Sequence, residues 1–378
     1  MLKFLHMSDT HLGSRQYMRD DRENDFYEAF REAIGIAIDE KVDFIVHSGD
    51  LFDTWSPSNR ALSEFKDTAL KLREAGIPMF LIMGDHDRPK RTDYPAARIF
   101  DFLGIRLLGQ EGVEEYLFSK DGEEVLIVGI SNLKGSRRDQ LLEEYEKADL
   151  LAKGHRNSIL LSHQGITGFL IDDACEAKYD DLPKNFSYLA FGHVHEGGIR
   201  RERYPVFSYA GSTEMKSTRE IQAFTKNGKS VNLVTLVNGE VDVKRIKLSS
   251  VRFQYLIDTN FENYLNDIES MISQYSGSFA NKTPLVTLRI NGNGDHDEVK
   301  RNLARYTEIN FRPPEFISGK TEIEARPGMD SAEDYIKAYF KDNTNLADLA
   351  SEFYRHVKSD REDGMKWLRS KLGIGDMQ

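Results

Sequence analysis

The feature that most constrains this chain is a set of Asp- and His-containing clusters, each placed directly after a short apolar run. The runs cover residues 2–7, 44–47, 79–83, 159–161 and 188–191. Each has the length of one buried β-strand, and stretches with helical spacing, such as 23–40 and 57–74, lie between several of them. Short apolar strands that alternate with helices are typical of a mostly parallel sheet covered by helices, so we predict an α/β fold.

The clusters stand where those strands end. They are Ser8-Asp9-Thr10-His11, Gly49-Asp50-Leu51-Phe52-Asp53, Gly84-Asp85-His86-Asp87, Ser162-His163 and Gly192-His193-Val194-His195. The carboxyl ends of the strands in an open α/β sheet converge on one crevice, so clusters far apart in sequence can meet there. Alternation along an extended strand end also places both members of an Asp-x-His or His-x-His pair on the same side.

The residue types indicate metal chemistry. Imidazole and carboxylate groups bind ions such as Mn, Fe and Zn. Two ions about 3.5–4 Å apart can activate a water, neutralise a phosphate and stabilise a leaving oxygen. Any single His or Asp of this kind is more often structural, and the prediction depends on all the clusters occurring together. We therefore predict a two-metal phosphoesterase centre built from Asp9, His11, Asp50, Asp85, His86, His163, His193 and His195.

The order of these motifs resembles that of the calcineurin-like metallophosphoesterases. Three segments narrow the resemblance to the SbcD/Mre-eleven nucleases of DNA double-strand-break repair: SDTHLG at 8–13, GDLFDT at 49–54 and SHQGI at 162–166. The motif match spans residues 1–215, and the later regions are similar in order and size only. The resemblance implies a four-layer α/β/β/α sandwich with a small α+β capping domain and a helical C-terminal tail.

The resemblance also implies a role for each residue. Asp9, His11 and His195 would hold one ion, Asp85, His163 and His193 the other, and Asp50 would bridge both, with Mn²⁺ as the usual metal. His86 would protonate the leaving 3′ oxygen or stabilise the transition state, tasks that suit an imidazole. The implied reaction is phosphodiester hydrolysis in DNA, as a 3′-to-5′ exonuclease and a single-strand endonuclease.

Two positions depart from the family pattern. The pattern has Asn where Asp85 stands, and the added negative charge should hold metals at least as firmly but oppose an anionic substrate. Some members have His where Asp53 stands, whereas bacterial-type members have Asp. A carboxylate at this position would orient His86 and stabilise its charged form, although a solvated turn Asp is an alternative interpretation.

The pattern changes after Gly198. Residues 206–210, 231–237 and 241–248 alternate apolar and polar side chains, and Asn227-Gly228 and Asn238-Gly239 are turn signals, so we predict antiparallel strands there. We expect a nuclease domain over 1–249, a DNA-binding α+β capping domain over 250–314, a linker over 315–330 and a helical tail over 331–378. The resemblance implies that the tail binds an SMC-like coiled-coil ATPase of the SbcC/Rad-fifty type, and a tail that packs on its own domain is the alternative. It also implies that part of the apolar surface of the helices at 57–74 and 94–104 forms a homodimer, although core packing is the default explanation for such apolar positions.

The charge and residue composition of the chain limit which partners it can bind and in which compartment we expect it. The net charge of −11 counts against broad electrostatic binding of DNA but allows a local basic groove. We expect DNA contacts from residues beside the motifs, although solvated loop charges are the alternative: Arg15, Tyr17, Arg19, Arg88, Lys90, Arg91, Arg200, Arg201 and Arg203. No run is long enough for a membrane span, residues 1–8 form a strand pattern rather than a signal peptide, and Cys175 is the only cysteine. These features predict a cytoplasmic protein with no membrane partner.

Two other functions stay open at this point. A phosphatase or phosphodiesterase of small molecules would need the metal site but not the basic loops, the cap or the tail. A DNA-binding scaffold with weakened catalysis is the second alternative, and Asp85 is the one residue that favours it.

Overall fold

The computed structural model describes residues 1–89, 94–133, 137–169, 175–201, 205–279, 282–317 and 344–359, with 336–337, 340, 367–368 and 370–371. The chain divides into two compact units. The first contains Met1–Ile257, Asn266–Leu288 and Asn302–Pro313, and the second contains Asp258–Leu265, Arg289–Arg301 and Pro314–Gln378. Every strand-end cluster of Asp and His belongs to the first unit.

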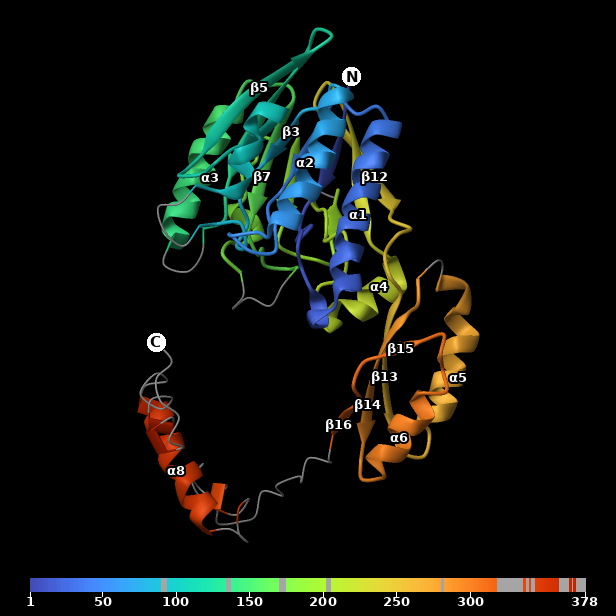
Figure 1. Cartoon of the computed structure of the whole chain (residues 1–378). Helices are drawn as coiled ribbons and strands as arrows, with labels where there is room; N and C mark the ends of the chain where they lie inside the picture. The colour runs from blue at the N-terminus through green and yellow to red at the C-terminus, as the bar shows by residue number, and fades with distance from the viewer. Residues whose placement is uncertain are drawn as a thin grey trace. The chain divides into compact units, whose positions relative to one another are not determined.

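The first unit contains two six-stranded sheets (Figure 1). The first sheet has the order β12-β11-β1-β2-β3-β4. Its strands are β1 (Leu2–Met7), β2 (Phe44–His47), β3 (Met79–Leu81), β4 (Ile105–Leu107), β11 (Ser230–Val237) and β12 (Glu240–Lys247). β1 to β4 are parallel, and the first three of them are predicted apolar runs. β11 and β12 form the antiparallel hairpin predicted at Asn238-Gly239.

The second sheet has the order β5-β6-β7-β8-β10-β9. Its strands are β5 (Glu114–Lys120), β6 (Glu123–Ile130), β7 (Ser158–His163), β8 (Tyr188–Gly192), β9 (Gly198–Arg200) and β10 (Val206–Tyr209). β10 is not purely antiparallel as predicted: it pairs in parallel with β8 and antiparallel with β9. The reason is the short β9, which reverses the chain after β8, so that β10 re-enters the sheet in the direction of β8.

The turn signal at Asn227-Gly228 lies between β10 and β11, where it ends helix α4 (Ile221–Asn227) rather than joining two strands directly. Gly228 has a φ of 71°, and its N–H donates to the Phe224 carbonyl, so the glycine terminates a helix.

Helices cover the outer face of each sheet, and a third apolar core lies between the sheets. α1 (Asp20–Asp39), α2 (Asn59–Glu74) and the 3₁₀ helix η2 (Ala96–Leu103) pack on the first sheet through residues such as Phe30 and Phe65. α3 (Arg138–Ala152) packs on the second through Tyr145. Phe44 and Ile127 belong to the core shared by the two sheets. This arrangement confirms the predicted four-layer α/β/β/α sandwich, and burial on both faces explains the continuously apolar strands.

The later chain contains both strands and helices. β13 (Gln254–Asn260), β14 (Leu285–Asn291), β15 (Asn310–Phe311) and β16 (Glu315–Ile317) form a four-stranded sheet, accompanied by α5 (Tyr264–Tyr275) and α6 (His296–Leu303). α8 (Thr344–Ser359) lies in the predicted tail. Most of the predicted linker and much of the tail fall outside the described residues. In the part of the chain that is described, no helix has both the length and the apolar composition of a membrane span.

Candidate metal centre

The side chains that follow five strands of the sandwich come together in space. These side chains form three groups, and within each group the ligand atoms lie within 4.8 Å of one another. The groups are Asp9, His11 and His195; Asp85, His163 and His193; and Asp9, Asp50 and His163. The structure thus brings together every residue that the sequence analysis named as a metal ligand, with Asp50 in the group that shares members with both others.

The separations within the cluster suit intervening cations. His163 Nε2 lies 3.6 Å from Asp50 Oδ2 and 3.9 Å from both Asp9 Oδ1 and Asp85 Oδ1. His11 Nε2 lies 3.7 Å from Asp50 Oδ2. Nitrogen and carboxylate ligands bind ions at about 2.1 Å, so two ligands of one ion lie up to about 4.2 Å apart. These contacts are too long for good hydrogen bonds but fit ligands that share an ion.

Hydrogen bonds orient two of the imidazoles toward the cluster. His163 Nδ1 lies 2.7 Å from the Ser48 carbonyl and His195 Nδ1 lies 3.0 Å from Glu220 Oε1. Both partners are acceptors, so each Nδ1 carries the proton and each Nε2 presents a lone pair. His163 Nε2 is buried and has no hydrogen-bond partner among the described residues. An orphaned imidazole nitrogen that faces carboxylates is what a metal site requires, so the donor set fits divalent cations.

The backbone at these strand ends is strained. Asp9, His11, Asp50 and His193 all have positive φ, at 51°, 44°, 56° and 95°. Non-glycine residues rarely adopt this region, at a cost of about 1–3 kcal/mol each, and such residues concentrate at functional sites. The neighbouring Gly84 is required for a different reason, since an added Cβ would lie 2.1 Å from Asp50 Oδ1. The arrangement of these side chains thus lowers the stability of the fold.

The electrostatics of the cluster favour bound positive charge. Burial lowers the pKa of His163, but the carboxylates of Asp50 and Asp9 outweigh burial and raise that pKa above its ordinary value. Burial, followed by the charge of Lys216, lowers the pKa of His11 well below its ordinary value. His11 is therefore neutral, the form in which an imidazole binds a metal.

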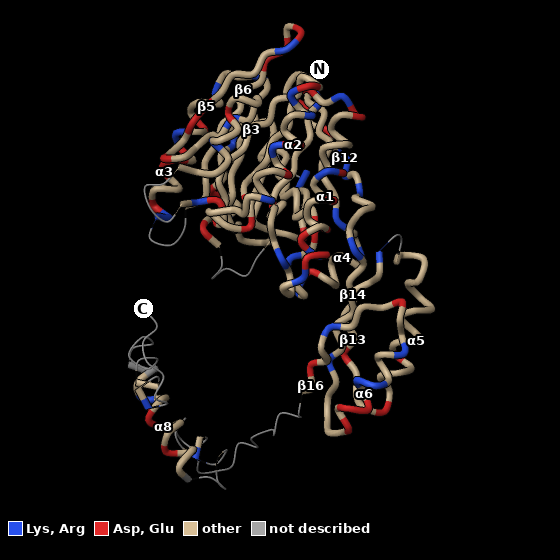
Figure 2. The backbone as a smooth tube through the Cα atoms, in the orientation of Figure 1, with Lys and Arg blue, Asp and Glu red and all other residues tan. Residues whose placement is uncertain are grey.

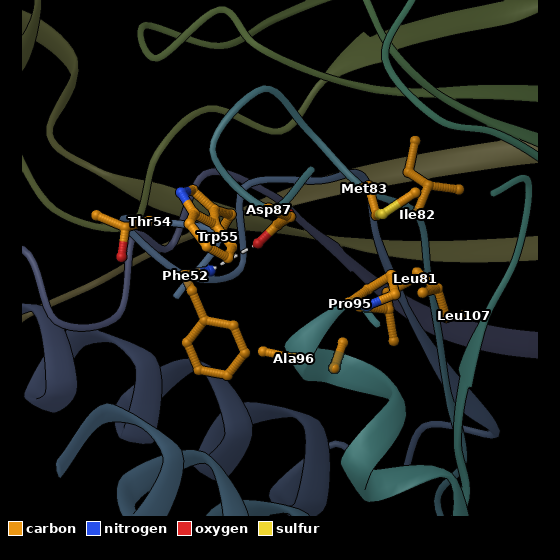
Figure 3. A pocket seen from close by; sticks show the side chains of 11 residues that line it. Phe52, Thr54, Trp55, Leu81, Ile82, Met83, Asp87, Pro95, Ala96 and Leu107 are labelled. Carbon is orange, nitrogen blue, oxygen red and sulfur yellow. Dashed lines mark hydrogen bonds between the residues drawn. The ribbon is translucent and has the colours of Figure 1, made fainter. Parts of the chain in front are cut away.

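Asp87 braces the two loops that carry Asp50 and Asp85. Its carboxylate accepts hydrogen bonds from the backbone N–H groups of Leu51, Phe52 and Gly84 at 2.9–3.1 Å. Figure 3 shows this carboxylate beside an apolar pocket whose lining includes Phe52 and Met83. Burial, and then the charge of Asp50, raises the pKa of Asp87 to about 6.

His86 and Asp53 are in contact, although not in the predicted way. His86 Nδ1 lies 2.6 Å from the main-chain oxygen of Asp53, so the imidazole is oriented by a carbonyl rather than by the Asp53 carboxylate. The His86 backbone N–H donates to Asp50 Oδ1 at 2.9 Å. The Asp53 carboxylate instead lies 2.8 Å from Lys216 Nζ. Since a carbonyl only accepts, Nδ1 carries a proton and Nε2 is the atom that faces the site.

Sequence reasoning missed two residues of this region, Lys216 and Glu220. Lys216 Nζ lies 3.2 Å from His86 Nε2 and 3.2 Å from His11 Nδ1. Glu220 accepts from His195 and also from Lys229 Nζ at 2.5 Å. Burial raises the pKa of Glu220, but Lys229 and His195 outweigh burial and hold it below its ordinary value. The one available signal was Ser217-x-x-Glu220, the spacing of a capping box, which the structure contains.

Most of the residues expected to contact DNA already have protein partners. Arg15 donates to Asp20 at 2.5 Å and Arg19 to Asp21 at 2.8 Å. The Tyr17 ring lies 3.9 Å from the Arg312 guanidinium, and Arg200 lies 4.4 Å from the Phe169 ring. Arg88 donates to the Gln110 carbonyl at 3.1 Å, and Arg201 donates to the Val243 carbonyl. Lys90, Arg91 and Arg203 lie outside the described residues.

Comparisons with known proteins find relatives of this chain. Residues 2–197 match the family of calcineurin-like phosphoesterases. The chain is 45% identical over 361 residues to the DNA double-strand break repair protein Mre11 of Thermoplasma acidophilum, covering 96% of each protein. It is 32% identical to the protein of the same name from Methanococcus maripaludis, covering 97% of this chain and 98% of the relative. A solved dimetal phosphatase from Danio rerio superposes with a TM-score of 0.42 at 12% identity, covering 65% of this chain and 99% of that structure.

The family match spans the strand-end motifs up to His195, and the two relatives extend the similarity over 96% and 97% of the chain. The resemblance noted in the sequence is therefore confirmed. The chain belongs to the calcineurin-like phosphoesterase family and, within it, to the nucleases of the Mre11/SbcD type.

Proposed function

We propose that this chain is a manganese-dependent nuclease that acts as a 3′-to-5′ exonuclease and single-strand endonuclease in the repair of DNA double-strand breaks. One observation carries the proposal: three carboxylates from three strand ends, those of Asp9, Asp50 and Asp85, lie 3.6–3.9 Å from an orphaned His163 Nε2. The names of the two full-length relatives supply the substrate class, DNA, and the repair role.

The metal assignment follows from the grouping of side chains. Asp9, His11 and His195 would hold one ion, Asp85, His163 and His193 the other, and Asp50 would serve both. When bound, two such ions supply Lewis-acid chemistry, which activates water and neutralises phosphate charge. A mixed set of imidazole and carboxylate ligands suits Mn²⁺.

His86 is the residue proposed to act on the leaving group. Its Nδ1 proton is engaged by the Asp53 carbonyl, so a second proton on Nε2 can be donated to the departing 3′ oxygen. The imidazole ring of His86 lies 4.8 Å from that of His11, measured between ring centroids, which places it beside the ligand cluster. The Asp53 main chain fixes its orientation.

DNA contacts, oligomeric state and partner complete the proposal. The loops beside the motifs would bind DNA through side chains such as Arg88 and Arg200, and the cap over 250–314 would add further contacts. Ile99 and Phe102 on η2 are 59% and 70% exposed, and an apolar pair of this kind would suit a homodimer contact. The tail over 331–378 would bind an SMC-like coiled-coil ATPase of the SbcC/Rad-fifty type, in a cytoplasmic setting that suits a single cysteine.

A nuclease assay tests the proposal. The manganese-loaded protein and its His86→Ala variant are compared on single- and double-stranded DNA labelled at the 5′ end. We expect progressive shortening from the 3′ end by the wild type and a loss of about 10²- to 10⁴-fold in the variant, the usual worth of a positioned proton donor. Hydrolysis of nucleotide monoesters or cyclic nucleotides with none of DNA would instead support a small-molecule phosphoesterase. DNA binding without any hydrolysis would support a scaffold.

A further inference from the structure

We propose that Lys216 is a substrate-binding residue that contacts a non-bridging oxygen of the scissile phosphodiester beside His86. The inference rests on the proposed phosphodiesterase function and adds a residue that neither the family motifs nor the strand-end pattern includes. Lys216 lies in the segment after β10, between the second sheet and α4.

The position of the Lys216 ammonium carries the inference. Nζ lies 2.8 Å from Asp53 Oδ1, 3.2 Å from His86 Nε2 and 3.2 Å from His11 Nδ1. His11, Asp53 and His86 form a group with the spacing of a metal site, yet the centre of their contacts is this ammonium. The group therefore already has its cation, and it differs in this respect from the orphaned nitrogen of His163.

The backbone of Lys216 is held by the same carboxylate that orients a presumed metal ligand. Glu220 Oε1 accepts from Lys216 N at 3.1 Å, from Ser217 N at 2.9 Å and from His195 Nδ1 at 3.0 Å. Glu220 Oε2 is itself fixed by Lys229 Nζ at 2.5 Å and by Ser212 Oγ at 3.1 Å. The Lys216 backbone is thus fixed by the same hydrogen-bond network that orients His195.

Charge and access indicate what the ammonium would bind. The Lys216 side chain is 23% exposed, and the side chain of its ion-pair partner Asp53 is 24% exposed, so neither is sealed in the core. Because the ammonium is partly open to solvent, a phosphate oxygen can approach it alongside the carboxylate. A lysine ammonium is a compact positive charge suited to binding phosphate. Lys216 Nζ lies beside His86 Nε2, so it would be close to the phosphate whose leaving oxygen His86 protonates.

Phosphate affinity gives a test that does not depend on turnover. Binding of inorganic phosphate to the manganese-loaded protein is measured by calorimetry for the wild type and for Lys216→Gln, Lys216→Arg and Lys226→Gln. Lys226 is exposed on α4, so its variant is a matched control for the loss of one positive charge. We expect Lys216→Gln to weaken phosphate binding about 10- to 100-fold, the worth of one charge-assisted hydrogen bond, and Lys216→Arg to restore most of it. Lys226→Gln should bind as the wild type does.

Kinetics and metal binding complete the test. With bis(p-nitrophenyl) phosphate as substrate, Lys216→Gln should raise KM, while the variant still binds manganese. Unchanged phosphate affinity, or a loss of manganese binding in Lys216→Gln, would overturn the assignment, because the lysine would then serve only the fold. If the wild type hydrolyses this diester but not DNA, the nuclease proposal fails while phosphate binding still decides the role of Lys216.

Discussion

At the scale of single residues, the candidate site combines side chains at the ends of strands with Lys216 and Glu220 from the segment after β10. Asp9 and His163 could be named as ligands because each follows an apolar run, and parallel strands deliver their carboxyl ends to one place. Lys216 and Glu220 were not named, since they lie several residues beyond the end of β10 rather than directly after a strand. The path of this segment depends on long-range packing. The contact between His86 and the Asp53 carbonyl was not predictable either, because a main-chain oxygen is the same in every residue type.

The first prediction concerns Glu220, which we regard as a positioning residue for His195. Glu220→Gln keeps an acceptor for His195 Nδ1 but removes the charge that strengthens this bond, so manganese affinity should fall about 10- to 100-fold. Titration calorimetry with manganese measures this effect directly, and circular dichroism checks that the fold survives. Glu196→Gln is the control, because Glu196 is exposed next to His195 in sequence. Equal affinity in Glu220→Gln and the wild type would show that His195 needs no carboxylate partner.

The second prediction concerns Asp85, which stands where the family pattern has Asn. Its Oδ1 lies 3.9 Å from both His163 Nε2 and His193 Nδ1, so its negative charge belongs to the cluster that an anionic substrate must approach. Asp85→Asn should raise kcat/KM on DNA, by about tenfold for one unit charge a few ångströms away, and should change manganese occupancy less. Steady-state kinetics and metal analysis of the same samples give both quantities. The opposite pattern, unaltered kinetics with metal binding abolished, would refute this account of the charge.

At the scale of elements, the sequence located strands well but not always their partners. The run that became β10 was correctly predicted as a strand, yet its parallel pairing with β8 depends on the three-residue β9, too short to give a period-two pattern. The distribution of strands over two sheets came from family resemblance, because an apolar run is the same in either sheet. α1 and α2 were predictable because each begins and ends close to the limits of its helical spacing.

A buried network of charges joins α1 to segments that follow much later in the chain. Asp25, which is 1% exposed, accepts from Arg22 at 2.5 Å and from Arg252 at 2.7 Å, and lies 2.9 Å from Lys282 Nζ. Arg22 also donates to Glu214 at 3.1 Å, two residues before Lys216. This network holds the segment that carries Lys216 against α1.

The third prediction is that Asp25→Asn destabilises the fold by about 3–5 kcal/mol, because it leaves buried cations without their shared counter-ion. Burial raises the pKa of Asp25, but Arg252, Arg22 and Lys282 outweigh it and hold the pKa below 3.8. The contribution is therefore present above pH 3.8 and is lost as the pH falls below it, so the cost of the variant should shrink in acid. Urea unfolding at several pH values measures this, with the exposed Asp20→Asn on the same helix as the control. A cost that is constant with pH would contradict the linkage.

At the scale of the whole molecule, the net charge sets a condition on DNA binding. The chain carries −11, and Figure 2 shows Lys and Arg interspersed with Asp and Glu along it rather than gathered in one part. Several of the arginines beside the motifs are paired with acidic or carbonyl groups, as Arg19 is with Asp21. Long-range attraction of DNA by the bare protein is therefore weak, and local sources of positive charge must carry the binding.

The fourth prediction is that DNA binding depends on metal even when nothing is cut. Asp9, Asp50 and Asp85 place three carboxylates at the site where the phosphodiester must lie, and two divalent cations would reverse the sign of that charge. Fluorescence anisotropy with the His86→Ala variant, which keeps every presumed ligand, separates binding from cleavage. At fixed ionic strength we expect manganese to tighten binding of a short single-stranded DNA by about tenfold or more over the protein in EDTA. Equal affinity in manganese and EDTA would mean that DNA is held entirely by the loops and the cap, away from the ligand cluster.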